Sequence, residues 1–281
     1  MLRYSYLLFF VVLFFNQSNA QSVSTPESIK AKYPIKVIAH RGASGYAPEN
    51  TLASVKKAIE LGANYVEIDV HFSKDKEVVV IHDATLERTT NHIGQVQFYR
   101  LEEIKKFDAG GRFSEQYKGE KIPTLGEVIK ATKGKAILLI EIKKGTTYYN
   151  GIEKKILEII EQHQAKEWVE VQTFYDPVLK NWLKLNSHIA AHKLMVGNVF
   201  PFYVDDMLNG GNIFRKTYGA QGINPNLKWM GNKLFQKIKQ NGRTCYVWTV
   251  NDEKDIKKAI ELKVDGIIGN YPDRVIKLLK K

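Results

Sequence analysis

Three short apolar runs in the first third of the chain carry polar residues of the kinds that transfer protons or bind anions. His40 and Arg41 end the first run, Glu67 and Asp69 alternate with apolar residues in the second, and His82 ends the third. Such side chains are costly to remove from water unless a partner compensates them. Carboxylates suit hard divalent cations, histidine transfers protons near neutral pH, and arginine grips phosphate. The combination indicates phosphoryl chemistry beside a metal ion.

A later apolar run adds Glu141 and Lys143, which share one face of a strand. In a closed sheet they would point inward together with Glu67 and Asp69. Three carboxylates in one cavity repel one another, and one divalent cation would relieve the repulsion. An all-oxygen ligand set favours Mg²⁺ or Ca²⁺ over Zn²⁺. The alternative is a network of internal salt bridges with Arg41 and Lys143.

Two histidines, His40 and His82, lie at strand ends beside this candidate metal site. Imidazole titrates near neutral pH, so a pair can act as acid and base in one turnover. Each could instead be a hydrogen-bonded packing residue. Arg41 could hold a phosphate through two parallel hydrogen bonds, and Lys143 adds a point charge. The remaining histidines lack this context, and we predict them to be structural or exposed: His71, which shares a face with Asp69, and His92, His163, His188 and His192.

Strand-like runs alternate with amphipathic helical stretches, a pattern typical of parallel α/β proteins. Asn50 or Thr51 is the predicted N-cap of the first such helix. A parallel barrel needs eight strands. Nine runs resemble strands: 36–40, 65–71, 78–82, 136–143, 169–174, 191–196, 220–224, 244–250 and 264–269.

Connection length resolves the excess strand. Only six residues separate 65–71 from 78–82, whereas a parallel crossover needs a dozen or more. The run 78–82 should therefore turn back as an antiparallel hairpin arm, with its turn centred on residues 74 and 75, which places His82 roughly opposite Glu67. The other eight runs predict a TIM (β/α)8 barrel.

No linker rich in glycine, serine or proline divides the chain, so residues 21–281 are predicted to form a single TIM-barrel domain. Residues from about 84 to 123 are polar and glycine-rich, with one short helical stretch. They follow the hairpin directly, and long excursions of this kind in compact domains are usually functional or mobile. We expect a small insertion lying over one end of the barrel.

The N-terminus has the pattern of a secretory signal. Arg3 is followed by nine apolar residues at 7–15 and by small residues ending at Ala20, which predicts a signal peptide over 1–20. A membrane anchor is the alternative, but nine residues are too few to cross a bilayer. We therefore expect an exported protein, periplasmic or secreted, without a stable membrane anchor. The single Cys245 precludes an internal disulfide and is expected to be packed.

The formal net charge is +12. A basic surface favours anionic partners such as phosphodiesters. The lysines are scattered along helical stretches and form no basic tract, so we expect a small-molecule phosphodiester substrate and no nucleic-acid partner. The oligomeric state stays open.

Several motifs, in order from about 36 to 275, resemble the glycerophosphodiester phosphodiesterases. This resemblance implies a TIM barrel with an insertion after the second strand's hairpin. It also implies hydrolysis of glycerophosphodiesters to glycerol 3-phosphate and an alcohol with the help of a divalent cation. The motifs are His40-Arg41-Gly42-Ala43, Pro48-Glu49-Asn50-Thr51, Glu67-Ile68-Asp69-Val70, His82-Asp83, Glu141-Ile142-Lys143, Val247-Trp248-Thr249-Val250-Asn251 and Asp265-Gly266-Ile267-Ile268.

The resemblance also implies roles for single residues. Trp248 would line the pocket for the glycerol or alcohol group, unless it only packs the barrel. The other roles fall on the residues already singled out: Glu67, Asp69 and Glu141 as metal ligands, His40 and His82 as the acid–base pair, and Arg41 and Lys143 as phosphate-binding residues.

Two positions depart from the family pattern. Gln172-Thr173-Phe174 stands where a Ser-Phe-Asp-like run is usual, and Gly269 precedes Asn270 where a threonine is common. Both bear on substrate preference. Two other functions remain open: phospholipase D-type cleavage of lysolipids or sphingomyelin, aided by an apolar loop at 200–203, and non-catalytic binding of phosphate esters. The sequence does not decide whether water or a substrate hydroxyl is the nucleophile, or which histidine is the acid.

Overall fold

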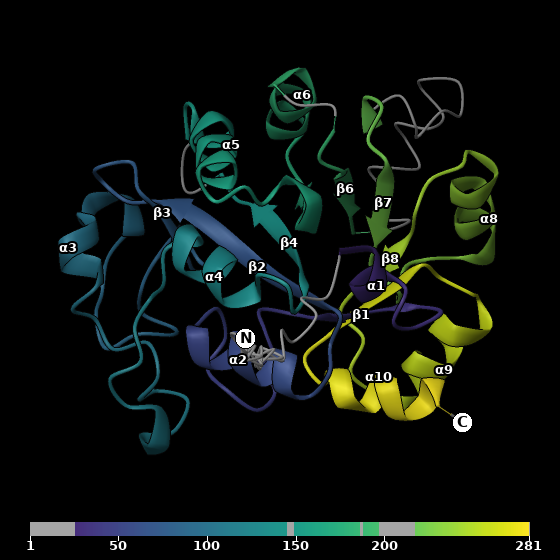
Figure 1. Ribbon diagram of the computed structural model, residues 1–281, viewed down its shortest axis with the longest axis horizontal. Helices are drawn as coiled ribbons and strands as arrows, with labels where there is room; N and C mark the ends of the chain where they lie inside the picture. Colours follow the sequence, from purple (N-terminus) through teal and green to yellow (C-terminus); the bar gives the residue numbers. More distant parts are fainter. Residues whose placement is uncertain (1–25, 145–148, 186–187, 197–216, 281) are drawn as a thin grey trace, which may run out of the picture.

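The computed structural model describes residues 26–144, 149–185, 188–196 and 217–280. Eight parallel strands form a nearly closed barrel with helices outside it (Figure 1). Their order is β7-β6-β5-β4-β2-β1-β9-β8, and parallel bridges at Gly222–Thr244 and Asn226–Trp248 bring the two ends of the sheet together. The strands are β1 (Lys36–Ala39), β2 (Tyr65–Phe72), β4 (Ile137–Ile142), β5 (Val169–Thr173), β6 (Ala191–Met195), β7 (Gly222–Pro225), β8 (Tyr246–Val247) and β9 (Gly266–Gly269).

The ninth strand is the hairpin arm. β3 (Val78–Val80) pairs antiparallel with β2 and with no other strand of the sheet, so the hairpin prediction is confirmed, and so is the TIM-barrel fold. The short connection allows no other arrangement, because a parallel crossover could not fit into it.

The predicted register of this hairpin was wrong by one residue. Val70 is opposite Val80, which centres the turn on Asp75. Continued by the same spacing, His82 falls level with Ile68 rather than Glu67. Local hydrogen bonds set the turn: Ser73 donates through its backbone to the carbonyl of residue 77 and through its hydroxyl to the Asp75 carboxylate. Turn geometry fixes the register of a hairpin.

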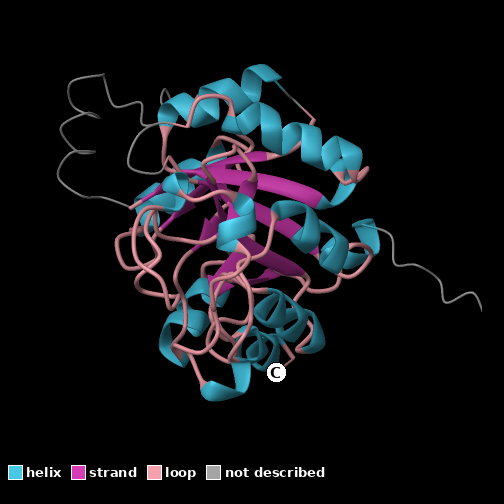
Figure 2. Cartoon of the chain, turned by 90° about the vertical axis from the view of Figure 1, so that its left-hand side faces the viewer, coloured by secondary structure: helices cyan, strands magenta, loops and turns pink. Residues whose placement is uncertain are grey.

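The helices form an outer layer around the strands, as the two views show (Figures 1 and 2). Thr51 is the N-cap of the first helix after β1, because its side chain accepts a hydrogen bond from the Ser54 backbone. The α-helices are α1 (Pro26–Lys30), α2 (Leu52–Glu60), α3 (Leu101–Ile104), α4 (Leu125–Thr132), α5 (Ile152–Gln162), α6 (Asp176–Leu185), α8 (Asn232–Gln240), α9 (Glu253–Glu261) and α10 (Pro272–Leu279), and the 3₁₀ turns are η1 (Val96–Phe98), η2 (Glu115–Tyr117) and η3 (Lys166–Trp168).

Apolar side chains fill two separate layers, one on each face of the barrel wall. Val66, Ile68 and Val70 of β2 belong to the cluster between the sheet and the helices. Tyr65 and Leu139 belong to a smaller cluster inside the barrel. The alternation along β2 therefore turns its apolar face toward the helices, and Glu67 and Asp69 lie on the opposite, inward face.

Residues 84–123 carry η1, α3 and η2 and lie next to β3 (Figure 1). They build a small core of their own on Val79 and Ile81, with Leu86, Val96, Ile104, Phe107, Ala109 and Ile122. This core fixes the segment on the hairpin that leads to His82.

Several predicted features lie outside the described residues, namely the signal segment 1–20 and the apolar loop at 200–203. Cys245 is fully buried, as expected. In the described part of the chain, no helix combines the length and apolar character needed to cross a membrane.

Candidate active site

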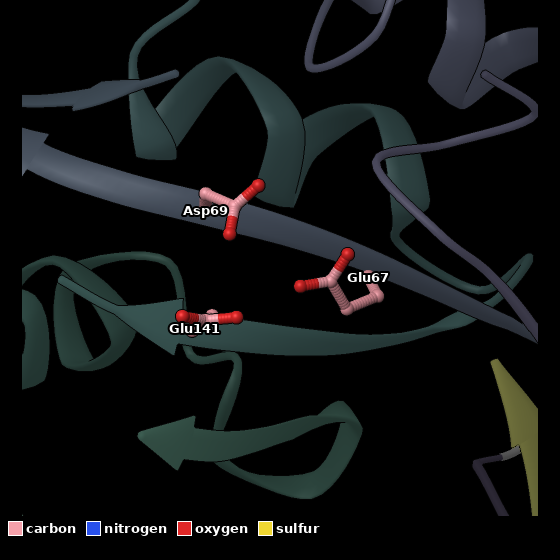
Figure 3. Close-up of side chains that lie close together, drawn as sticks. All are labelled: Glu67, Asp69 and Glu141. Carbon is pink, nitrogen blue, oxygen red and sulfur yellow. The ribbon is translucent and has the colours of Figure 1, made fainter. Parts of the chain in front are cut away.

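Three buried carboxylates face one another inside the barrel (Figure 3). Glu67 and Asp69 come from β2, and Glu141 comes from β4, where it pairs in register with Asp69. One oxygen from each lies within 4.8 Å of the others. Parallel pairing between adjacent strands thus places all three at one end of the barrel, and the group could hold a metal ion.

Two positively charged side chains lie among the three carboxylates. Arg41 Nε is 3.4 Å from Asp69 Oδ2, and Lys143 Nζ is 3.0 Å from Asp69 Oδ1 and also contacts Glu141. Burial and the charges of Asp69 and Glu141 raise the pKa of Glu67 well above its usual range. Burial likewise raises the pKa of Glu141 to about 7, although Lys143 opposes it. Asp69 differs: the two cations outweigh burial and lower its pKa.

The donor set fits a hard divalent cation. All three candidate ligands offer carboxylate oxygens, the chemistry that Mg²⁺ and Ca²⁺ prefer. Asp69 Oδ1 and Arg41 Nε are both buried, and each has an ion-pair contact but no hydrogen bond. The salt bridges expected in the alternative interpretation are present, yet they leave one carboxylate in excess.

His40 follows β1 and lies against the end of the last strand. Its Nδ1 is 2.8 Å from Asn270 Oδ1, and its backbone N–H donates to the Gly269 carbonyl. Because an amide oxygen only accepts, Nδ1 carries the hydrogen and Nε2 is the free nitrogen. Burial, aided by Arg41, lowers the pKa of His40 to about 4. The ring is therefore neutral at pH 7 and able to accept a proton.

His82 is held in a similar way after β3. Its Nδ1 is 2.6 Å from Asp83 Oδ1, which again leaves Nε2 free. Burial lowers the pKa of His82, helped by Lys143 and opposed by Asp69. His71 supports the same loop: its Nε2 donates to the His82 carbonyl at 3.0 Å.

An ion-pair chain links the two sides of the site through Arg88 at the start of the 84–123 segment. Arg88 Nε is 2.6 Å from Asp83 Oδ2, and its terminal nitrogens bind both oxygens of Glu49 at 2.7 and 2.8 Å. Glu49 in turn accepts from Arg41 at 2.9 Å. This series of ion pairs from Asp83 to Arg41, the Arg88 bridge, thus joins Asp83, which holds the His82 ring, to Arg41, a candidate phosphate-binding residue.

The two histidines, Arg41, Lys143 and two of the three carboxylates open into one cavity of about 80 Å³. Trp248 lies on its apolar side, edge-to-face with Phe174 at 5.4 Å, and donates its indole N–H to the Asn224 carbonyl. Of the sequence-predicted site residues, all but Asp69 line the cavity, and Asp69 contacts two of them. The lining is His40, Arg41, Glu67, His82, Glu141, Lys143, Gln172, Phe174, Leu194, Trp248, Thr249 and Ile268.

Sequence reasoning missed the residues that hold these groups in place. Asn270 was considered only for substrate preference, as was Gln172, whose amide donates to Glu67 at 3.2 Å. Glu49 belongs to one of the sequence motifs but has no predicted role, and Arg88 has none either. A glutamine on the inward face of a strand is the one signal that could have pointed to a member of this set, Gln172.

Comparisons with known proteins find relatives over most of this chain. A glycerophosphodiester phosphodiesterase from Caldanaerobacter subterraneus is 39% identical over 247 residues, covering 87% of this chain and 98% of the relative. A human lysophospholipase D is 25% identical over 275 residues, covering 88% and 86%. The solved structure of an Oleispira antarctica phosphodiesterase in complex with the product sn-glycerol-3-phosphate matches with a TM-score of 0.76 at 27% identity, covering 90% and 99%.

A family model gives the most direct assignment. It describes the glycerophosphoryl diester phosphodiesterase family and matches residues 40–274, from the first histidine of the site to the last helix of the barrel. This confirms the family suggested by the sequence motifs, and the non-catalytic alternative is set aside because the family and several relatives covered over nearly their whole length are named as phosphodiesterases. The chain therefore belongs to the glycerophosphoryl diester phosphodiesterase family.

Proposed function

We propose that this enzyme cleaves glycerophosphodiesters to glycerol 3-phosphate and an alcohol by acid–base catalysis with His40 and His82. The observation that carries the proposal is the pair of histidines anchored through Nδ1, with free Nε2 atoms, at one cavity with three buried carboxylates. Neutral imidazoles at this place can accept a proton at pH 7.

The charged residues suit a phosphate. Arg41 and Lys143 line the cavity and would neutralise the two non-bridging phosphate oxygens as charge develops. Glu67, Asp69 and Glu141 would hold the divalent cation, Ca²⁺ or Mg²⁺. When bound, such a cation stabilises the charge of the transition state as a Lewis acid.

The proton transfers balance with two histidines. One imidazole takes the proton of the attacking hydroxyl as its oxygen bonds to phosphorus. The other takes up a proton from solvent when the anionic phosphate binds beside it and then gives that proton to the departing alkoxide. The attacking group is either water or the neighbouring hydroxyl of the glycerol moiety, in which case a cyclic phosphate is opened by water in a second round. Trp248 and Phe174 offer an apolar wall for the carbon skeleton of the substrate.

The decisive experiment is hydrolysis of glycerophosphocholine by the purified enzyme. We expect release of glycerol 3-phosphate that a chelator abolishes and that added Ca²⁺ or Mg²⁺ restores. His40→Ala and His82→Ala should each lower kcat by about 10²–10⁴-fold. Full activity in either variant, or in Glu67→Ala, would refute the assignment of the site.

A lipid substrate is the second candidate, because the chain is similar to a lysophospholipase D. The apolar wall of the cavity would then contact an acyl-glycerol group. Competition between glycerophosphocholine and a lysophosphatidylcholine for the same enzyme distinguishes the two proposed activities. A higher kcat/KM for the lysolipid would favour the phospholipase D-type reaction.

Export is also part of the proposal, and it is supported by the apolar run at 7–15 and the small residues up to Ala20. We propose that the mature enzyme is periplasmic or secreted and begins at Gln21. Sequencing the N-terminus of the protein recovered from its own cells tests this, and an intact Met1 would contradict it.

A further inference from the structure

Two amide side chains inside the barrel have no part in the proposed chemistry. Gln172 lies on β5, in register with Glu141, and Asn224 lies on β7; they are 2% and 0% exposed. A buried amide is costly unless its donors and its acceptor are all paired. The hydrogen bonds of these two side chains lead across the barrel to Glu67.

A backbone group fixes the orientation of Asn224. The backbone N–H of Tyr246 donates to Asn224 Oδ1 at 3.1 Å, and an N–H has no lone pair with which to accept. The oxygen of Asn224 must therefore face β8, and its NH₂ group faces the other way. This NH₂ group donates to Gln172 Oε1 at 3.0 Å.

The orientation of Gln172 follows from that of Asn224. With its oxygen held by Asn224, its NH₂ group points to Glu67 and donates to Oε1 at 3.2 Å. The other oxygen of Glu67 accepts from the Arg41 backbone N–H at 2.9 Å. Each carboxylate oxygen thus has one neutral donor and keeps a lone pair for a further ligand. A reversed amide would place an oxygen against the carboxylate.

We propose that Gln172, aligned by Asn224, is the positioning residue that orients Glu67 for the divalent cation. The inference rests on the proposed role of Glu67 as a metal ligand. Partners that hydrogen-bond to a ligand set its direction, and their loss lowers metal affinity by about 10–100-fold. Neutral donors suit this place because a further charge inside the barrel would need its own partner.

Metal affinity is the readout that a merely structural role would not change. Gln172→Leu keeps a similar volume and removes the donor to Glu67. Titration of the metal-free variant with CaCl₂ or MgCl₂ in a calorimeter should show a Kd about 10–100-fold higher than that of the unaltered enzyme. Activity should recover as the metal concentration is raised. Should Gln172→Leu fail to fold, Gln172→Met offers the same loss with a more flexible side chain.

A double-mutant cycle tests whether Asn224 acts through Gln172. Asn224→Leu alone should weaken metal binding, because Gln172 is then free to turn its amide. Added to Gln172→Leu, it should change the Kd little further, since the path is already broken. Additive effects of the two substitutions would contradict the relay.

The matched control is Gln221→Leu, which removes an amide that accepts from the Ala191 backbone at 2.9 Å, away from the carboxylates. It should lower thermal stability and leave the metal Kd unchanged. A Kd for Gln172→Leu equal to that of the unaltered enzyme would overturn the positioning role and leave the proposed function intact. An unchanged Kd in Glu67→Gln would overturn both.

Discussion

Buried carboxylates lie at two successive levels of the same barrel: a single glutamate at the lower level, and above it the group of three beside the cavity. Glu170, two residues before Gln172 on β5, accepts from the Tyr65 and Tyr246 hydroxyls at 3.1 and 3.0 Å and lies 3.2 Å from His192 Nε2. Burial raises the pKa of Glu170, but the nearby His192 and the donors around the carboxylate outweigh it, and the pKa is lowered. Both oxygens of the Glu170 carboxylate therefore accept a hydrogen bond within the barrel.

The three carboxylates beside the cavity are also buried, but they differ from Glu170 in their balance of charge. Glu67, Asp69 and Glu141 share only Arg41 and Lys143, and the pKa values of both glutamates are raised. A satisfied buried carboxylate stabilises the fold, whereas carboxylates in excess of their cations call for an ion or a proton. Perturbed pKa values in a cavity mark functional sites for this reason.

Exchanging one carboxylate at each level should separate the two roles most strongly. Glu141→Gln should lower kcat/KM by about 10³-fold or more, because a ligand of the proposed cation and a partner of Lys143 is lost, and it should cost little stability because it relieves repulsion. Glu170→Gln should leave kcat within a few-fold and lower the free energy of unfolding by about 1–3 kcal/mol. Kinetics and urea unfolding of both variants provide the measurement. The reverse pattern would contradict the comparison.

The anchors of the histidines should give the next largest effect. Asn270→Ala removes the acceptor that fixes the His40 ring, and a misplaced group can cost up to about 10²-fold in kcat. Asn270→Asp keeps an oxygen at that place and should retain most of the activity. Equal losses in the two variants would show that the side chain matters for packing and not as an acceptor.

The sequence predicted most of the site because parallel strands end at one rim. His40, Glu67 and Glu141 belong to different strands, yet the fold brings all strand ends together, and alternation decides which side chains point inward. The supporting residues could not be found in this way. Gln172 and Asn224 meet across the barrel, and alternation gives the face of a residue but not its partner. The hairpin register failed by one residue because hydrogen bonds of Ser73 decide the turn.

The pH dependence of metal binding should come from the group of three carboxylates and not from Glu170. The pKa of Glu141 is raised to about 7, so below pH 7 an incoming cation must displace a proton. Affinity should therefore rise with pH, by about tenfold between pH 6 and 8, and level off above pH 8. His40, with its pKa lowered to about 4, stays neutral across this range.

Calorimetry with CaCl₂ in two buffers of different ionisation enthalpy checks this, because the difference in heat counts the protons released. Glu170→Gln is the control: the pKa of Glu170 is lowered, so it carries no proton to lose in this window. Release of the same number of protons at pH 6 and pH 8.5 would show that Glu141 is ionised before the cation binds.

The smallest effect is expected where water can replace the lost partner, at the Arg88 bridge. Arg88 is 47% exposed and makes its contacts with Asp83 and Glu49 at the rim. Arg88→Met should lower kcat/KM only about 3–10-fold, because solvent screens such pairs. The loss should still exceed that of Lys57→Met, which breaks an exposed pair on α2 with Glu60.

Guanidinium added in solution distinguishes a positioning role from a loss of packing. A free guanidinium ion can bind between Asp83 and Glu49 in Arg88→Met and should restore part of the lost kcat/KM, while Lys57→Met should not respond. Guanidinium also weakens folding, so the test must stay at low millimolar concentration. If Arg88→Met has normal kcat/KM, then Asp83 alone fixes the His82 ring. The exposed rim of the site would then depend less on supporting contacts than the buried interior of the barrel does.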